Sequence, residues 1–281
     1  MTKILPTVLT IAGSDSGGGA GIQADLRTFS ALQVYGCSVI TAVTAQNPNE
    51  VRRVDILPPD SIQTQLETVL TSFPIHYAKT GMLGNKETVE SIAFLAQKYQ
   101  LKLIVDPVMI STSGAKLLED SAITVIKEKL FPLADWITPN IPEAEFICKR
   151  KLSNQTDYAE AALYLYKQFK CNCLLKSGHA LTSNLATDIV CYQGELFTVS
   201  SPTVKIRGNT AHGTGCTLSS ALTAISAQGK NWQQAIIEAK AFVYGSLYEN
   251  MKLSDDLSQM YPPEKNYLNN ITFKPYQLSC N

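Results

Sequence analysis

The chain alternates between stretches with strand-like and helix-like spacing of their apolar residues. Residues 7–12 and 37–45 are largely apolar and rich in β-branched side chains, as buried strands are, whereas residues 20–32 place an apolar side chain near every third or fourth position, as a helix does. The same criteria predict further strands at 51–57, 76–80, 103–105, 136–138 and 173–176, a hairpin over 186–200, and helices from residue 59, over 86–99 and 122–129, from residue 142, and over 158–169, 214–227 and 232–248.

This unbroken alternation decides the fold class. Strands connected through helices cross over with one hand and build a mainly parallel central sheet with helices on both faces. A length of 281 residues gives a prior of roughly two domains, but the alternation shows no break, so we expect a single α/β domain over 1–253. Residues 254–281 contain prolines, asparagines and tyrosines without a clear period, and we interpret them as a C-terminal tail whose order the sequence does not define.

Polar residues follow the predicted strands at the points where the strands end. They are Gly13 to Asp15, Gln46 and Asn47, Thr80 and Gly81, Asp106, Thr138 to Asn140, and Lys176. Because ligands of open α/β sheets bind beyond the carboxyl ends of the strands, we expect one site assembled from many strands. Loops need polar residues in any case, and this simpler reading accounts for some of these positions.

The composition excludes several classes of protein. Hydrophobic residues make up 45% of the chain and charged residues 17%, which supplies a large core without disulfides or metals and excludes a disordered chain. Basic and acidic residues number 24 each, so nothing favours a nucleic-acid partner, and no apolar stretch approaches the roughly 18 residues of a membrane span. The cysteines, 7 in all, are scattered, which fits reduced thiols in the cytoplasm.

A glycine-rich loop from Gly13 to Gly21 follows the first predicted strand. Its spacing does not match the dinucleotide fingerprint, in which Ile22 would have to be glycine, and the chain has no Walker A motif. Glycines still allow a ligand to approach the backbone closely. A tight turn that packs the next helix onto the sheet explains this loop equally well.

A second glycine loop, residues 212–216, comes directly before a predicted helix of small and apolar residues. Unpaired N–H groups at a helix start, together with the helix dipole, bind anions, so a reacting phosphoryl group would fit there. Cys216 falls in the first turn, where the positive helix end lowers a thiol pKa, and its thiolate would accept or orient a substrate hydroxyl proton. A cysteine that merely fills a tight helix start is the alternative. His179 and His212 are interpreted as loop hydrogen bonders rather than bases.

Several segments together resemble one enzyme family. They are residues 12–15 (AGSD), 17–26 (GGGAGIQADL), 39–47 (VITAVTAQN), 79–83 (KTGML), 105–109 (VDPVM), 138–144 (TPNIPEA) and 212–217 (HGTGCT). In this order they are similar to the hydroxymethylpyrimidine/phosphomethylpyrimidine kinases of thiamine biosynthesis, which belong to the ribokinase superfamily. The resemblance runs from about residue 8 to about residue 248 and implies a single-domain, ribokinase-like fold.

The resemblance also implies an activity and a set of site residues. The activity is phosphorylation of 4-amino-5-hydroxymethyl-2-methylpyrimidine, and then of its monophosphate, with ATP as co-substrate, Mg²⁺, and a homodimer as the assembly. The implied residues are Cys216 as general base with Gly213, Thr214 and Gly215 as an anion hole; Gly13, Asp25, Gln46 and Met82 for the substrate; Asn140, Lys176, Gly213 and Gly215 for ATP and its phosphates; and Asp106 and Glu143 for the metal.

The side-chain chemistry agrees with these roles, although each position also has a simpler reading. The Gln46 amide complements the amino group and ring nitrogen of an aminopyrimidine, as glutamine does when it reads adenine. Lys176 offers phosphates a point charge, and the carboxylates of Asp106 and Glu143 suit Mg²⁺. The simpler readings are a turn residue for Gln46, a solvent-facing lysine for Lys176, a helix-dipole carboxylate for Glu143 and ordinary core for Met82.

Three other functions stay open at this point. A cysteine-type pyridoxal or pyridoxine kinase would share the anion hole and the thiol. A nicotinamide-dependent oxidoreductase is disfavoured by the broken dinucleotide fingerprint. A non-catalytic pyrimidine-binding protein is disfavoured because Asn140, Glu143 and Cys216 are all present.

Overall fold

The computed structural model describes residues 4–109, 118–177, 184–205, 211–255 and 257–278. Within these ranges the protein is built on a ten-stranded sheet. In spatial order its strands are β12 (Thr272–Pro275), β9 (Glu195–Pro202), β8 (Leu185–Tyr192), β7 (Asn172–Leu175), β6 (Ala134–Ile137), β5 (Lys102–Val105), β4 (Ile75–Thr80), β1 (Thr7–Asp15), β2 (Tyr35–Gln46) and β3 (Val51–Ile56). The six strands β1, β2 and β4 to β7 are parallel, and β3, β8, β9 and β12 run antiparallel to their neighbours, so the predicted mainly parallel sheet is confirmed.

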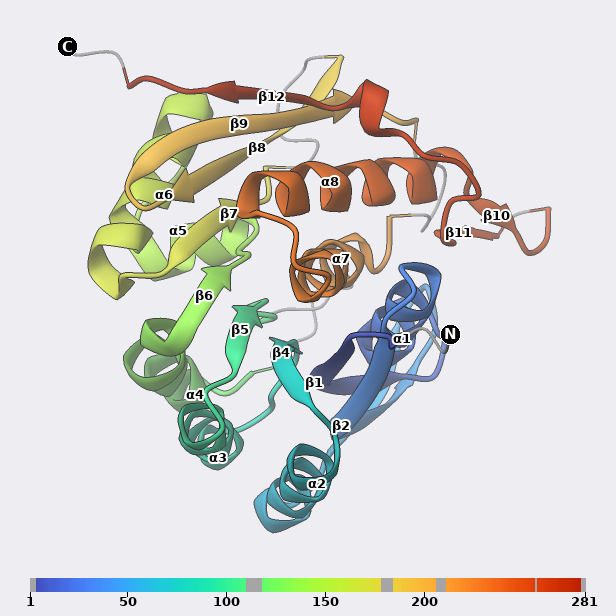
Figure 1. Cartoon of the computed structure of the whole chain (residues 1–281), viewed down its shortest axis with the longest axis vertical. Helices are drawn as coiled ribbons and strands as arrows, with labels where there is room; N and C mark the ends of the chain where they lie inside the picture. The colour runs from blue at the N-terminus through green and yellow to red at the C-terminus, as the bar shows by residue number, and fades with distance from the viewer. Residues whose placement is uncertain (1–3, 110–117, 178–183, 206–210, 256, 279–281) are drawn as a thin grey trace.

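Helices cover both faces of the sheet (Figure 1). One face carries α1 (Gly21–Ala31), α7 (Thr214–Ala227) and α8 (Trp232–Tyr248), and the other carries α2 (Pro59–Ser72), α3 (Lys86–Lys98), α4 (Asp120–Val125), α5 (Ile141–Cys148) and α6 (Gln155–Phe169). In β5, Leu103 and Val105 join the core under α2 to α6, whereas Ile104 joins the core under α7 and α8, because successive strand residues point to opposite faces. In the part of the chain that the structure describes, no helix has the length and hydropathy of a membrane span.

Asparagine side chains fix where several helices begin. Asn85, Asn140, Asn154 and Asn231 each accept a hydrogen bond from a backbone N–H in the first turn of α3, α5, α6 and α8. A capping asparagine lies before the first apolar residue of the helix pattern. For this reason α6 starts at Gln155, three residues before the predicted start at residue 158. The helix predicted over 122–129 is α4 followed by a π-helical turn, Ile126–Leu130.

The order in which successive strands are added to the sheet changes direction at β1. This strand pairs with β2 on one side and β4 on the other, so the connections from β1 and β4 onwards lead to opposite halves of the sheet. In doubly wound sheets such a switch leaves a crevice beyond the carboxyl ends of the two strands. The residues that follow β1 and β4 therefore lie where a ligand is expected.

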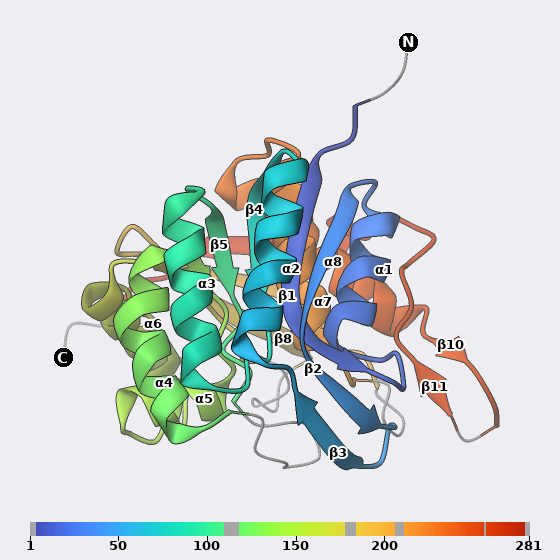
Figure 2. The ribbon, with the colours of Figure 1, turned by 90° about the horizontal axis from the view of Figure 1, so that it is seen from below.

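The C-terminal residues add structure that the sequence pattern did not predict. The small β10 (Met251–Lys252) and β11 (Ser258–Gln259) pair beside α1 (Figure 2), and β12 then extends the main sheet by pairing with β9. Phe273 of β12 stacks on Phe197 with ring centroids 5.2 Å apart and meets Trp232 of α8 edge-on at 5.9 Å. These aromatic contacts attach β12 to both the sheet and α8.

Candidate active site

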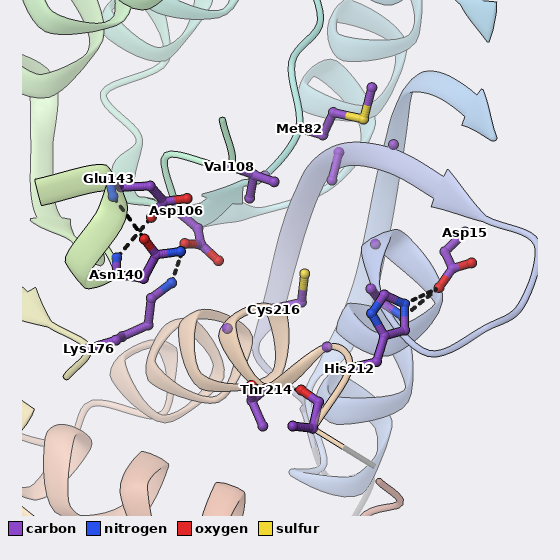
Figure 3. Close-up of a pocket in the computed structure, with 18 of the residues that line it drawn as sticks. Asp15, Met82, Asp106, Val108, Asn140, Glu143, Lys176, His212, Thr214 and Cys216 are labelled. Carbon is purple, nitrogen blue, oxygen red and sulfur yellow. Dashed lines mark hydrogen bonds and ion pairs between the residues drawn. The ribbon is translucent and has the colours of Figure 1, made fainter. Parts of the chain in front are cut away.

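A cavity of about 480 Å³ opens beyond the carboxyl ends of β1, β2, β4 and β5, at the start of α7 (Figure 3). This volume lies in the range of small-molecule sites. The structure brings together in its wall every predicted site residue except Asp25, namely Gly13, Gln46, Met82, Asp106, Asn140, Glu143, Lys176, Gly213, Thr214, Gly215 and Cys216. The expectation of one site assembled from many strand ends is therefore met by the geometry.

The first turn of α7 forms the floor of the cavity. Gly213 caps the helix with a φ of 83°, a left-handed conformation that favours glycine, and a Cβ here would collide with the carbonyl oxygen of Gly19. The first amides of a helix have no acceptor within it, so those of Gly215 and Cys216 are free to bind an anion. A Cβ on Gly215 would lie 3.1 Å from Lys176 Nζ, so this glycine lets the ammonium group approach the helix start.

The Cys216 thiol is half-buried and points into the cavity (Figure 3). Burial raises its pKa to about 11, although the positive Lys79 opposes the shift. The prediction that the helix start lowers this pKa is therefore wrong for the protein without ligands. Loss of solvation outweighs the helix dipole, and the resting group is the neutral thiol.

Lys176 and Asp106 form an ion pair at one end of the cavity. Lys176 Nζ lies 2.7 Å from Asp106 Oδ1, and Ser219 Oγ donates to the other carboxylate oxygen at 3.3 Å. Burial lowers the pKa of Lys176, but the negative Asp106 and Glu143 more than offset this effect, so the pKa is raised and the side chain stays charged. Lys176 is thus a mostly buried cation in the cavity wall rather than a solvent-facing lysine.

Glu143 and Asn140 make reciprocal hydrogen bonds at the start of α5. The Glu143 carboxylate accepts from the Asn140 N–H at 2.8 Å, and the Asn140 side chain accepts from the Glu143 N–H at 2.9 Å. Burial raises the pKa of Glu143 to about 7; Lys176 opposes the shift and Asp106 adds to it. Among the residues that the structure describes, no three His, Cys, Asp or Glu side chains form a ready-made metal cage. Two carboxylates in the wall of one cavity nevertheless fit Mg²⁺, which usually takes few protein ligands and keeps waters or phosphate oxygens.

The opposite end of the cavity combines Gln46 with Asp15, one of the polar residues expected at the strand ends, and with His212, which was expected to be a loop hydrogen bonder. His212 Nε2 lies 3.1 Å from both Asp15 Oδ2 and Gln46 Nε2. Burial raises the pKa of Asp15, but hydrogen bonds from His212, Ala20 and Gly17 outweigh it, so this pKa is lowered. The interpretation of His212 as a loop hydrogen bonder is confirmed, whereas His179 lies outside the described residues.

Asp25 lies behind the cavity wall rather than in it. Its fully buried carboxylate accepts hydrogen bonds from Thr10 and Ser220 at 2.6 Å each and pairs with Lys79 Nζ at 2.9 and 3.0 Å. The expected contact between Asp25 and substrate is therefore corrected to a contact with Lys79, which does line the cavity. Lys79 was not among the predicted site residues; the available signal was a lysine directly before the end of a predicted buried strand.

Comparison with known proteins agrees with this geometry. A family model described as phosphomethylpyrimidine kinase matches residues 15–260. The hydroxymethylpyrimidine/phosphomethylpyrimidine kinase of Haemophilus influenzae is 48% identical over 246 residues, which cover 85% of this chain and 90% of that protein. A pyridoxal kinase from Staphylococcus aureus, solved with AMP-PCP and pyridoxal, superimposes with a TM-score of 0.85 at 31% identity, over 98% of this chain and 100% of the other.

A further solved structure is nearer in sequence. The phosphomethylpyrimidine kinase of Clostridium difficile is 40% identical with a TM-score of 0.73, and the match covers 85% of this chain and 97% of the other. The predicted ribokinase-like fold is confirmed by these neighbours. With a family model and relatives that both span most of its length, the chain belongs to the phosphomethylpyrimidine kinase family.

Proposed function

We propose that the protein is an ATP-dependent kinase that phosphorylates 4-amino-5-hydroxymethyl-2-methylpyrimidine and then its monophosphate, yielding the diphosphate for thiamine diphosphate biosynthesis. One observation carries the proposal: Gln46, Cys216 and the Lys176–Asp106 pair line one cavity. The thiol lies between that pair and His212 (Figure 3), and His212 Nε2 is 3.1 Å from the Gln46 amide nitrogen. The amide reads an aminopyrimidine edge, and the cations and helix amides receive phosphates.

The reaction needs the hydroxyl of the pyrimidine in line with the terminal phosphoryl group of ATP. Gln46 and Met82 hold the ring at one end of the cavity, which directs the hydroxymethyl group towards Cys216. The amides of Gly215 and Cys216 and the ammonium of Lys176 stabilise the negative charge on the transferring group. Positioning and electrostatics of this kind account for most of phosphoryl transfer, and the protein performs little covalent chemistry.

Asp106 and Glu143 are the residues that would hold Mg²⁺. The ion would supply positive charge next to the phosphate oxygens. Asp106 is also the counter-ion of Lys176 at 2.7 Å, so it holds this lysine in the cavity before ATP arrives. Asn140 fixes Glu143 through the reciprocal hydrogen bonds at the start of α5.

We expect the substrate hydroxyl to lie next to Cys216, which lines the cavity. Its thiolate would accept the hydroxyl proton as general base, a contribution worth about 10²–10⁴-fold in rate. With a resting pKa of about 11, the thiol must become easier to ionise in the loaded site. Each phosphate that binds adds negative charge, so the fixed cations around Cys216 determine whether a thiolate can form.

The test is release of ADP from the purified protein with the pyrimidine alcohol and, separately, with its monophosphate. We expect turnover with both, each strictly dependent on the acceptor. The comparison arm is pyridoxal, because a pyridoxal kinase shares the fold. A kcat/KM for pyridoxal above that for the pyrimidine alcohol would overturn the proposed substrate, and no ADP release with any of the three would overturn the kinase activity.

The assembly and compartment are also part of the proposal. We expect a homodimer, as the resemblance implies, and light scattering of the purified protein would measure it. We place the protein in the cytoplasm, where thiols stay reduced. In the described ranges, Cys37, Cys148, Cys171, Cys173, Cys191 and Cys216 are free thiols, which suits that compartment.

A further inference from the structure

A fully buried ion pair lies directly behind the cavity. Lys79 of β4 and Asp25 of α1 are both inaccessible to solvent, and two Lys79 N–H groups are used on the two carboxylate oxygens of Asp25, at 3.0 and 2.9 Å. Thr10 and Ser220 donate to those oxygens, so the carboxylate is saturated. Lys79 borders the cavity, but its ammonium group is not accessible to solvent, so its charge acts on the cavity from behind the wall.

A hydrogen bond from Ser220 connects the Lys79–Asp25 pair to α7, the helix that carries Cys216. Ser220, which donates to Asp25 at 2.6 Å, comes one helical turn after Cys216 and on the same side of α7. Gly81 leaves room for the lysine, since a Cβ there would lie 3.0 Å from Lys79 Nζ. Lys79 is therefore held in one place relative to Cys216, on the boundary between the core and the cavity.

Charged groups from four elements face Cys216. Lys79 comes from β4, Asp25 from α1, Asp106 follows β5 and Lys176 follows β7. Lys176 and Asp106 neutralise each other at 2.7 Å, and phosphates will compete for this lysine. Lys79 cannot be diverted in this way, because it is buried and bound to Asp25. It also lowers the pKa of Cys216, against the raising effects of burial, Asp25 and Asp106.

We propose that Lys79 is a positioning residue that allows Cys216 to act as base, with Asp25 limiting the strength of its charge. The proposal rests on the role of Cys216 in the proposed function. In the step itself, the substrate O–H bond breaks and an S–H bond forms while the oxygen bonds to the terminal phosphorus of ATP. The bond from that phosphorus to ADP breaks, and the thiol afterwards releases its proton to water.

The test measures ionisation of the thiol without any substrate. The full-length protein is alkylated with iodoacetamide over a range of pH, and mass spectrometry follows the peptide that contains Cys216. Lys79→Met combined with Asp25→Asn removes the pair without stranding a buried charge. We expect the alkylation rate of Cys216 at a fixed pH to fall about tenfold, the change that corresponds to one pKa unit.

A second buried pair in the same protein provides the matched control. Lys240 Nζ lies 2.7 Å from Asp188 Oδ2, and both side chains are nearly inaccessible. Lys240→Met combined with Asp188→Asn should leave the pH profile of Cys216 alkylation in place. If this control moves the profile as far as the Lys79 variant does, or if the Lys79 variant does not move it, the proposal is wrong.

Two further measurements keep the test decisive if the double variant does not fold. Asp25→Asn alone retains the lysine and should speed alkylation of Cys216; slower alkylation would contradict the proposal. Lys79→Arg, which conserves the charge, should keep kcat closer to wild type than Lys79→Met does. Equal losses in both would show that size rather than charge matters and would overturn it.

The path through Cys216 is tested in a Cys216→Ala background. There, loss of the Lys79–Asp25 pair should change kcat by less than about twofold, because residues that act through one group are not additive. A further loss as large as in the wild type would mean that Lys79 acts independently of the thiol. Since alkylation needs neither ATP nor the pyrimidine, a wrong substrate assignment would leave the alkylation result intact.

Discussion

Replacing Glu143 by glutamine should change how the stability of the protein depends on pH. Burial raises the pKa of this carboxyl to about 7. The side chain also accepts the Asn140 N–H at 2.8 Å in the cap of α5. The oxygen of a glutamine side chain can accept the same hydrogen bond, so Glu143→Gln removes the titration and keeps the cap.

The sign of the effect follows from the direction of the shift. Between the unfolded value of 4.5 and the folded value of about 7, native Glu143 holds a proton that the unfolded chain has released. The free energy of unfolding therefore falls as pH rises through this window; the favourable contribution is complete below it and lost above it. At about 1.4 kcal/mol for each pKa unit, ionised Glu143 lowers the stability by up to about 3 kcal/mol relative to neutral glutamine.

The assay is urea unfolding of both proteins, followed by tryptophan fluorescence in metal-free buffer from about pH 4.5 to about pH 8. The variant should match the wild type at the acid end and become the more stable protein as pH rises. An advantage that is absent at the alkaline end, or constant at every pH, would refute the reasoning.

Glu145→Gln is the matched control in the same helix. Hydrogen bonds from Lys151 and from the Leu152 N–H lower the pKa of Glu145, which is the opposite direction from Glu143. Its stabilising contribution is present above its unfolded pKa and is lost as pH falls through its folded pKa. The control variant should therefore be the less stable protein near neutral pH, with a deficit that shrinks towards acid.

Three other substitutions test the site and the tail. Cys216→Ala should lower kcat by ~10²–10⁴ while calorimetry shows ATP binding close to wild type; unchanged turnover would remove the thiol from the mechanism. Gly213→Ala should destabilise the protein by about 1–3 kcal/mol in thermal unfolding, because of its φ of 83° and the collision of its Cβ with the Gly19 carbonyl, and a wild-type melting curve would contradict that account. Phe273→Ala should lose about 2 kcal/mol, seen as an earlier tryptophan fluorescence transition, since the ring packs 5.9 Å from Trp232; no shift would show that this contact does not hold β12.

Most of the sheet was predictable because its inner strands are buried on both faces. Such strands are apolar along their whole length, and the helices between them show their period clearly. β12 was not predictable, since Thr272–Pro275 is only four residues long and includes a lysine and a proline. Its pairing with β9 depends on a tertiary contact of Phe273 that no local pattern records.

In the candidate site, too, the features that follow from local sequence were predictable and those that depend on tertiary contacts were not. Gln46 ends its strand and Asp106 and Lys176 directly follow theirs, and this position alone brings them to the cavity. Asp25 lies inside a helix, where the sequence does not say whether its carboxylate meets a ligand or an interior lysine. The pKa of Cys216 was predicted in the wrong direction because the helix dipole is visible locally, whereas burial is set by distant segments.

The late arrival of β12 has a consequence for synthesis on the ribosome. It emerges after every other strand of the described sheet, so nascent chains present the outer edge of β9 without its partner. Unprotected edges recruit strands from other molecules, and slowly maturing chains are the most exposed to this hazard. A transcript truncated before Thr272 would encode every residue of the catalytic cavity, yet its product would be threatened by aggregation rather than by any defect in chemistry.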